Sequence, residues 1–348
     1  MARTRIDARS GGGEWLRHGH GYDNIISIEN LLPSWQEFLC GKRSKKDVAE
    51  FSASLMDNIL ELRQELLEKT YKHSQYEAFV VNDPKTRNIH KAKVRDRLLH
   101  HAICRILYPL FDKKFIYDSY SSRLRKGTHR AIDRLNYFGR KVSQNNTKTV
   151  WVLKCDVRKF FASIDQRVLK NILKRDIQDP DTLWLLEEVI GSFQIENKGC
   201  VGLPLGNLTS QLLVNVYMNE FDQFIKHVLR VKYYIRYADD FVILDTNKNY
   251  LVNLLSKIEV FLSERLKLTL HPNKVSITTL ASGIDFLGWV NFPEHRVLRT
   301  STKKRMLKHL RQSPTEMMLS SCLGLIKHGN TLKLREKMVK DFVLRVKT

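Results

Sequence analysis

Two adjacent aspartates, Asp239 and Asp240, stand in the stretch YYIRYADDFVIL between two runs of aromatic and β-branched residues. A buried carboxylate without a partner is costly, and two neighbouring carboxylates repel each other. We therefore expect a cation beside the pair. A tight turn between two strands places both carboxylates at one edge of a sheet, where their hard oxygen ligands suit Mg²⁺. The alternative is an ordinary surface turn with two solvated aspartates.

A third carboxylate, Asp156, ends the apolar stretch TVWVLKCD, which has the composition of a buried strand. Three aspartates from neighbouring strand ends supply enough oxygen ligands for two Mg²⁺ ions. Two such ions about 3.5–4 Å apart activate an attacking 3′-oxygen and stabilise a leaving pyrophosphate. The three aspartates therefore indicate nucleotidyl transfer.

The order of the motifs is more specific than the aspartates alone. The chain resembles a reverse transcriptase in three motifs: a tyrosine followed after one residue by the two aspartates, the upstream DVRKFF, and the intervening LPLGNLTSQ. The resemblance runs from about Ile28 to the C-terminus. It implies an α+β right-hand polymerase fold, with fingers, a palm built on an antiparallel sheet, and a short helical thumb. It also implies an RNA-directed DNA polymerase that uses two Mg²⁺ ions, dNTPs, a template RNA and an RNA/cDNA duplex.

The resemblance assigns catalytic and nucleotide-binding roles to individual residues. Asp156, Asp239 and Asp240 hold the metal, and Lys274 in LHPNK matches a lysine that protonates pyrophosphate, a role that suits its cationic form. Phe161, five residues after Asp156, matches the bulky gate that clashes with a ribose 2′-OH. The other residues that match nucleotide-binding positions are Lys85, Arg87, Leu205, Gly206 and Gln211.

Template and primer contacts are also implied by the resemblance. Arg123 and Lys126 in SRLRKGTH match residues near the template or nucleotide phosphates, and Tyr237 packs near the primer. The stretch GIDFLGW matches the hairpin that supports the primer 3′ end, through Gly283, Phe286, Leu287, Gly288 and Trp289.

The sequence departs from the usual reverse transcriptase pattern at two positions, and these indicate which type of reverse transcriptase it resembles. Most reverse transcriptases carry glutamine before the loop glycine and proline after the serine, whereas this chain has Leu205 and Gln211. An aliphatic side chain cannot hydrogen-bond as glutamine does, so we expect looser base selection. Leu205 and the C-terminal LGLIKHGNTLKLREKM resemble the diversity-generating retroelement type, which implies a structured template RNA, a small basic accessory protein and error-prone copying.

Other functions remain open from the sequence. An antiphage defence reverse transcriptase, which copies a dedicated noncoding RNA or makes repetitive or untemplated DNA, shares the same motifs. Group II intron maturases fit less well, because no maturase or endonuclease domain follows the expected thumb. A rival of another class is a catalytically inactive scaffold that only binds RNA, although such a scaffold needs no clustered acids beside a polyanion.

The composition agrees with a nucleic-acid partner. Lysine and arginine number 59 against 37 acidic residues in a chain of 348, which gives a net charge of +22 and favours a polyanionic ligand. There is neither an apolar run long enough to span a membrane nor an apolar secretory core at the N-terminus. We expect a cytoplasmic protein, bacterial or encoded by a phage or mobile element. The five cysteines lack zinc-binding spacing, and we expect them to be reduced.

The elements that position these residues follow from periodicity. We expect helices over 28–71, 94–115, 166–193, 208–228 and 250–266, a hairpin around Asn82-Asp83-Pro84, and strands ending at 156 and spanning 231–236 and 241–245. The expected regions are a flexible basic tail at 1–24, fingers with part of the palm at 25–150, the palm at 151–298, and a helical thumb at 299–348.

Overall fold

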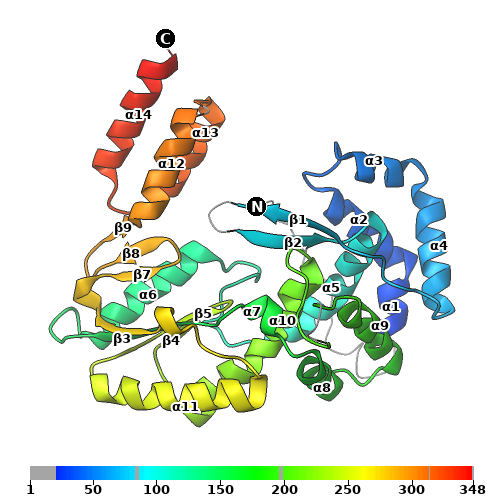
Figure 1. Cartoon of the computed structure of the whole chain (residues 1–348), viewed down its shortest axis with the longest axis horizontal. Helices are drawn as coiled ribbons and strands as arrows, with labels where there is room; N and C mark the ends of the chain where they lie inside the picture. The colour runs from blue at the N-terminus through cyan, green and yellow to red at the C-terminus, as the bar shows by residue number, and fades with distance from the viewer. Residues whose placement is uncertain (1–20, 83–85, 196–198, 313, 347–348) are drawn as a thin grey trace.

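The computed structural model describes residues 21–82, 86–195, 199–312 and 314–346. Its N-terminal part is helical, at the right of Figure 1, with α1 (Gly21–Ile26), α2 (Ile28–Leu39), α3 (Lys46–Ala53), α4 (Leu55–Leu67) and α5 (Val94–Lys114). The tail expected over 1–24 does not include residues 21–24, because they lie in α1 and Tyr22 is buried; residues 1–20 lie outside the described residues. The backbone N–H of Tyr22 donates to Asp179 Oδ2 at 2.7 Å, which ties α1 to a distant part of the chain.

A long antiparallel hairpin leaves this helical part. Its strands are β1 (Glu77–Val81) and β2 (Arg87–Lys91), with Val81 paired to Arg87 nearest the turn. This confirms the hairpin that the Asn82-Asp83-Pro84 signal predicts. Residues 83–85, and with them Lys85, lie outside the described residues.

A four-stranded sheet forms the centre of the molecule, and every pair of neighbours in it is antiparallel, as expected for the palm. The strands lie in the order β4 (Tyr234–Tyr237), β5 (Asp240–Asp245), β3 (Trp151–Asp156) and β6 (Ser276–Thr279). Side chains alternate between two cores: Leu153 and Ile243 pack with α11 (Lys248–Leu266), whereas Val152 and Val242 pack with α6 (Thr128–Val142). The two helices therefore cover opposite faces of the sheet.

The expected helix over 166–193 is two helices, α8 (Gln166–Asp176) and α9 (Pro180–Gly191). Pro180 lacks an N–H and stands in the first turn of α9, while Asp179 caps that helix by accepting from the backbone N–H of Asp181. The prediction of one helix was wrong because Pro180 cannot donate the backbone hydrogen bond that a continuous helix needs, so the first helix ends before it and a second begins there.

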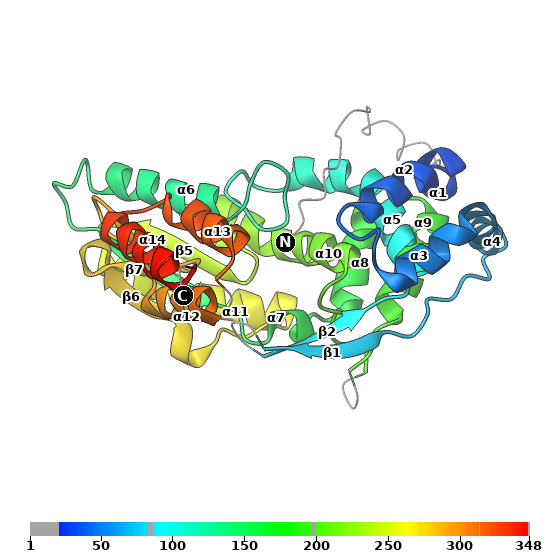
Figure 2. The ribbon, with the colours of Figure 1, turned by 90° about the horizontal axis from the view of Figure 1, so that it is seen from above.

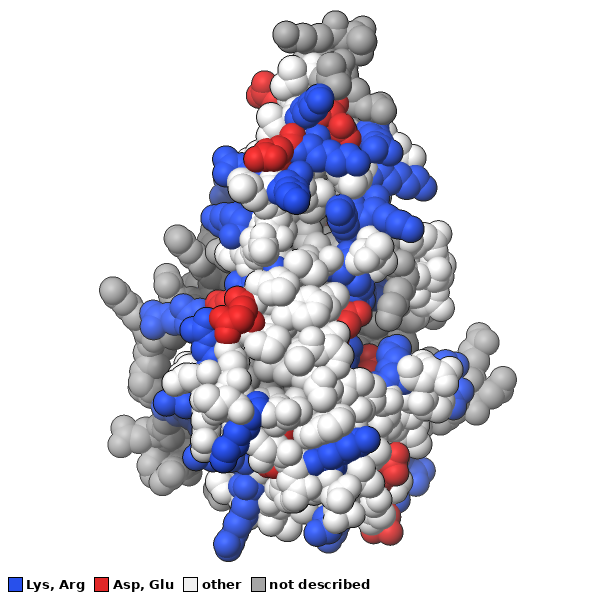
Figure 3. Space-filling model, turned by 90° about the vertical axis from the view of Figure 1, so that its left-hand side faces the viewer, with Lys and Arg blue, Asp and Glu red and all other residues white. Residues whose placement is uncertain are grey.

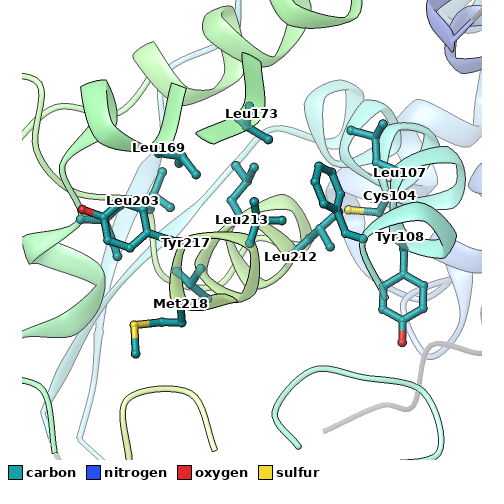
Figure 4. Packing of buried hydrophobic residues seen from close by; sticks show 14 of the residues in the cluster. Cys104, Leu107, Tyr108, Leu169, Leu173, Leu203, Leu212, Leu213, Tyr217 and Met218 are labelled. Atoms are coloured by element: carbon teal, nitrogen blue, oxygen red, sulfur yellow. The ribbon is translucent and has the colours of Figure 1, made fainter. Parts of the chain in front are cut away.

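The core beside the sheet is built around α10 (Leu208–Gln223), which continues as the π-helical turn η1 (Phe224–Val228). Figure 4 shows Leu212 and Leu213 of α10 among apolar side chains of α5 and α8, including Leu107 and Leu173. Because α10 is packed from several sides, the loop that leads into it has a fixed position.

A second, smaller sheet and a helical end complete the chain. The strands β7 (Ile284–Phe286), β8 (Trp289–Asn291) and β9 (Arg296–Leu298) form an antiparallel sheet. It leads into α12 (Thr300–Gln312), α13 (Glu316–Ile326) and α14 (Leu332–Val346), which project at the upper left of Figure 1. Lys and Arg side chains gather over these helices at the top of Figure 3. Within the described residues, no helix combines the length and apolar character that crossing a membrane requires.

Candidate active site

The aspartate pair lies at a two-residue turn between β4 and β5. Tyr237 pairs with Asp240 across the hairpin, which leaves Ala238 and Asp239 in the turn. Ala238 has a φ of 55°, in the left-handed region that is strained for a residue with a side chain. The guanidinium of Arg236 donates to the Ala238 carbonyl at 3.2 Å and so holds the strained turn in place.

The structure brings the third aspartate to the same end of the sheet. Asp156, the last residue of β3, pairs in register with Asp240, the first residue of β5. The backbone N–H of Val157 donates to the Asp239 carbonyl at 3.2 Å. Asp156, Asp239 and Asp240 therefore lie together at one sheet edge.

Burial first, and then repulsion between neighbouring carboxylates, raises the pKa values of the aspartate pair. Burial, followed by the charges of Asp156 and Asp240, raises the pKa of Asp239 to about 6. Burial also raises the pKa of Asp240, while the neighbouring Lys154 opposes that shift. A bound cation would relieve this repulsion.

Lys274 supplies one cation at this edge. It ends the short helix η2 (Pro272–Lys274), and its Nζ lies 2.6 Å from Asp156 Oδ1. The backbone N–H of His271 donates to the Asp156 carbonyl at 2.8 Å, which fixes η2 beside β3. In the part of the chain that the structure describes, no three His, Cys, Asp or Glu side chains converge to hold a metal ion. The three carboxylates nevertheless have the donor chemistry that Mg²⁺ prefers.

The glycine loop is tied to the N-terminal hairpin. The backbone N–H of His90 in β2 donates to the Leu205 carbonyl at 3.0 Å, and Asn207 Nδ2 donates back to the His90 carbonyl at 3.1 Å. Gly206 has a φ of 113°, and a Cβ there would lie 2.9 Å from Ile89 Cγ2. Glycine is therefore required by backbone conformation and by the close approach of β2.

The other residues matched to nucleotide positions lie on β2, α10 and the chain after β3. Arg87 is exposed at the end of β2 nearest the hairpin turn, and Gln211 is half-buried in the first turn of α10. Phe161 lies in the short helix α7 (Phe160–Ser163), and its carbonyl accepts from the backbone N–H of Leu203 at 2.8 Å. The chain after β3 is thus joined to the glycine loop.

The expected primer-grip stretch forms the β7–β8 hairpin. Phe286 pairs with Trp289, and both side chains are buried. Leu287 and Gly288 form the turn, with φ values of 52° and 87°. Gly283 has a φ of 87°, and a Cβ there would come within 2.7 Å of the Phe292 ring. Phe286 and Trp289 therefore anchor the hairpin, and Leu287 and Gly288 form its tip.

Arg123 and Lys126 make contacts inside the protein. The Arg123 guanidinium donates to Asp112 Oδ1 at 2.6 Å and to the Ile116 carbonyl at 2.6 Å. These contacts support the loop, and only 6% of the Arg123 side chain is exposed; its template contact stays a prediction. Lys126 Nζ lies 3.4 Å from the centre of the Tyr117 ring, at the surface.

Tyr237 occupies the last position of β4, beside the aspartate turn. Its hydroxyl accepts a hydrogen bond from Thr128 Oγ1 at 3.3 Å, so its side chain joins β4 to the start of α6. This hydrogen bond gives Tyr237 a structural role, and its place near the primer stays a prediction.

Several residues around the aspartates escape prediction from motifs. A hollow of about 430 Å³ beside Asp156 and Asp240 is also lined by Lys154, Asp285 and Arg299. Lys154 could have been found, because strand alternation places it on the same face as Asp156. The ion pair between Asp285 and Arg299, with Arg299 Nε 2.7 Å from Asp285 Oδ1, has no signal in the sequence.

Known proteins resemble this chain in sequence and in fold. The family model described as reverse transcriptase (RNA-dependent DNA polymerase) matches residues 72–290. Protein YkfC of Escherichia coli is 25% identical over 293 residues, which cover 73% of this chain and 75% of that protein. The group II intron-encoded protein LtrA of Lactococcus lactis is 22% identical over 290 residues. This match covers 64% of this chain but only 47% of LtrA.

A solved structure, apo telomerase from Candida tropicalis, matches with a TM-score of 0.50 and 12% identity over 78% of this chain and 56% of that one. At this identity the likeness bears on the fold alone, and it agrees with the expected polymerase fold. The family match covers both the glycine loop and the three aspartates. The chain belongs to the reverse transcriptase family, the RNA-dependent DNA polymerases.

Proposed function

We propose that the chain copies an RNA template into DNA by nucleotidyl transfer at Asp156, Asp239 and Asp240. The observation that carries this proposal is the strand register, which puts the backbone positions of these aspartates at one end of an antiparallel sheet. In this proposal, residues 25–150 form the fingers with part of the palm, 151–298 the palm and 299–348 the thumb.

Two Mg²⁺ ions, when bound by the carboxylates, would activate the primer 3′-oxygen and stabilise the pyrophosphate. Lys274 holds a proton at Nζ beside Asp156, where it can be given to the leaving group. Phe161 and Gly206 shape the space for the incoming dNTP, and Arg87 reaches its phosphates from the end of β2. Leu287 and Gly288 support the primer end.

The RNA/cDNA duplex would lie against the basic C-terminal helices. Helix α12 carries Lys303, Lys304, Arg305, Lys308 and Arg311, and the Lys and Arg side chains over this end of the molecule are visible in Figure 3. Phosphate contacts of this kind supply affinity without reading sequence. The proposed thumb therefore holds the duplex independently of its sequence.

Within the family we place the chain in the diversity-generating retroelement type, with a structured template RNA and a small basic accessory protein. Leu205 supports this subtype, because its side chain cannot hydrogen-bond to a nucleotide or its neighbours. An antiphage defence enzyme that copies a dedicated noncoding RNA is the second candidate, since it would share Leu205 and Gln211.

Fidelity tests the subtype. The purified chain is given a primed RNA of mixed sequence, Mg²⁺ and four dNTPs, and the cDNA is sequenced. We expect errors concentrated at one template base, and we expect Leu205→Gln to reduce them several-fold because glutamine restores a hydrogen-bonding side chain. Faithful or repetitive products from the unmodified chain would favour the defence candidate. An error rate left unchanged by Leu205→Gln would remove Leu205 as the cause.

A further inference from the structure

Five side chains form a continuous row along the outer side of α6 and the loop before it. Cations and rings alternate along it: Lys126 lies 3.4 Å from the Tyr117 ring centre, Arg134 lies 5.2 Å from Tyr117 and 5.1 Å from Tyr137, and Lys141 lies 5.7 Å from Tyr137. We call these residues the tyrosine row. Each contact falls within the range of a cation–π interaction.

The two tyrosines are exposed although their rings are large. Tyr117 is 66% exposed and Tyr137 is 49% exposed. The opposite side of α6 already supplies the core, through Ile132, Leu135 and Phe138. In Figure 2, α6 runs along the upper margin of the molecule, so its outer side faces away from the central sheet. The core therefore does not account for the exposed rings.

Contacts with the buried Asp118 and with β4 fix the position of the tyrosine row. Arg134 Nε lies 2.8 Å from Oδ1 of the buried Asp118. The Asp118 carbonyl accepts from the backbone N–H of Arg236 at 3.0 Å, and the backbone N–H of Tyr120 donates to the Arg236 carbonyl at 2.9 Å. The loop that carries Tyr117 is thus fixed to β4, and little ordering is needed before a ligand binds.

A hollow of about 350 Å³ lies at the end of the row. It is lined by Tyr137, Arg140, Lys141, Gln144 and Asn145. Gln144 and Asn145 both adopt left-handed backbone conformations, with φ values of 51° and 58°. The hollow combines an aromatic ring, two cations and two side-chain amides, which together suit a nucleobase and its phosphates.

Acidic side chains near this surface have partners of their own. Asp133 of α6 is paired with Arg296 at 2.7 Å, and Glu294 accepts from the side-chain amide of Asn146. Arg140 and Lys141 therefore give the end of the row a positive charge. This charge favours a polyanion over a neutral ligand.

We propose that the tyrosine row and its hollow bind an unpaired nucleic-acid strand at a site separate from the candidate active site. Bases stack on Tyr117 and Tyr137, and phosphates pair with Arg140 and Lys141. A duplex keeps its base faces stacked internally and would make no use of the exposed rings. An acidic peptide would use the cations but would leave the aromatic rings without a matching surface.

Binding to short labelled oligonucleotides without self-complementarity, followed by fluorescence anisotropy, tests this site directly. RNA and DNA strands of one sequence are compared, since both carry the same stacking and phosphate chemistry. We expect Tyr137→Ala to weaken binding of at least one strand roughly fivefold or more, whereas Tyr137→Phe keeps wild-type affinity because the ring remains. The strand that loses more affinity identifies the natural ligand.

Charge is tested by a matched pair of double variants. Arg140→Ala with Lys141→Ala should make the negative slope of log affinity against log salt shallower by about 1.4, because two phosphate contacts to a single strand are lost. Lys257→Ala with Arg265→Ala removes the same charge from exposed positions of α11 and should change that slope much less. Thermal melting checks that every variant is folded.

The proposal is overturned if folded Tyr137→Ala binds both unpaired strands as the wild type does. It is also overturned if the two double variants change the salt dependence equally, or if Tyr137→Ala weakens a blunt RNA/DNA duplex as much as a single strand. Primer extension on a short primed template should be unaffected by Tyr137→Ala. These binding comparisons do not depend on polymerase activity, so they decide the site even if the proposed function fails.

Discussion

Lys274 Nζ lies 2.6 Å from Asp156 Oδ1, so a lysine on η2 is ion-paired with the first of the three aspartates. The aspartate side chain is mostly buried, with 11% of it exposed, while 37% of the lysine side chain is exposed. The ammonium is therefore more open to solvent than the carboxylate that it pairs with, which suits the proton-donor role proposed for it.

We expect Lys274→Met to slow single-turnover primer extension by about 10²–10⁴-fold, the range for loss of a general acid. Lys274→Arg should restore nucleotide affinity more than rate, because a guanidinium keeps the charge but does not release a proton near neutral pH. Lys257→Met, at an exposed position of α11, is the control. If the Lys274→Met variant extended primers at the wild-type rate, Lys274 would not be the proton donor.

The raised pKa of Asp239, about 6, predicts a stability that depends on pH. Because the folded state favours the protonated carboxyl, the wild type loses stability as pH rises from the ordinary value near 4 through 6. Asp239→Asn removes that ionisation. We expect the variant, in EDTA, to be more stable than the wild type at pH 7.5 by on the order of 3 kcal/mol, and equally stable near pH 4.

Urea unfolding at the two pH values measures this difference, with Asp57→Asn on the exposed side of α4 as the control. Added Mg²⁺ should then stabilise the wild type more than Asp239→Asn, because the folded carboxylates bind it. An Asp239→Asn variant less stable than the wild type at pH 7.5 would contradict the conclusion that burial and repulsion destabilise the ionised Asp239 in the folded protein.

Arg236 and Asp222 form a fully buried ion pair at 2.6 Å, with neither side chain exposed. Tyr234 also donates to Asp222, at 2.7 Å. Asp222→Asn leaves the Arg236 charge buried without a counter-charge, so we expect a loss of about 3–5 kcal/mol in the free energy of unfolding. Denaturant unfolding measures it.

Glu188→Gln is the control for that variant, because Glu188 pairs with the largely exposed Lys72 and should cost less than about 1 kcal/mol. If both variants lose a similar, small amount of unfolding free energy, Arg236 must find another partner when Asp222 is replaced. Since Arg236 also holds the Ala238 carbonyl, Asp222→Asn should slow primer extension even where the protein remains folded.

Much of the central sheet could be predicted from the sequence. The apolar run ending at Asp156 and the two runs flanking Asp239 are local signals, and each forms a strand. The strand expected over 231–236 starts three residues later, at Tyr234, whereas the one expected over 241–245 is shifted by a single residue. The prediction of a helix over 94–115 is likewise confirmed by α5, because its apolar residues recur at helical spacing.

Contacts between distant residues could not be predicted in this way. The pairing of Arg236 with Asp222, and the hydrogen bond from Tyr22 to Asp179, depend on how separate elements pack. Arg123 is a further case in which residue type and spacing do not predict the contacts. They suggest a phosphate contact, yet packing gives its guanidinium partners within the protein. A basic residue in a loop carries no local signal that separates these two uses.

Primer extension is the most direct test of the central claim that Asp156, Asp239 and Asp240 form a metal-dependent polymerase site. The purified chain and its Asp239→Ala variant are given a primed RNA and four dNTPs, with Mg²⁺ or with EDTA. We predict templated DNA from the wild type with Mg²⁺ only, and none from the variant. Extension by the Asp239→Ala variant at the wild-type rate, or by the wild type in EDTA, would contradict the account.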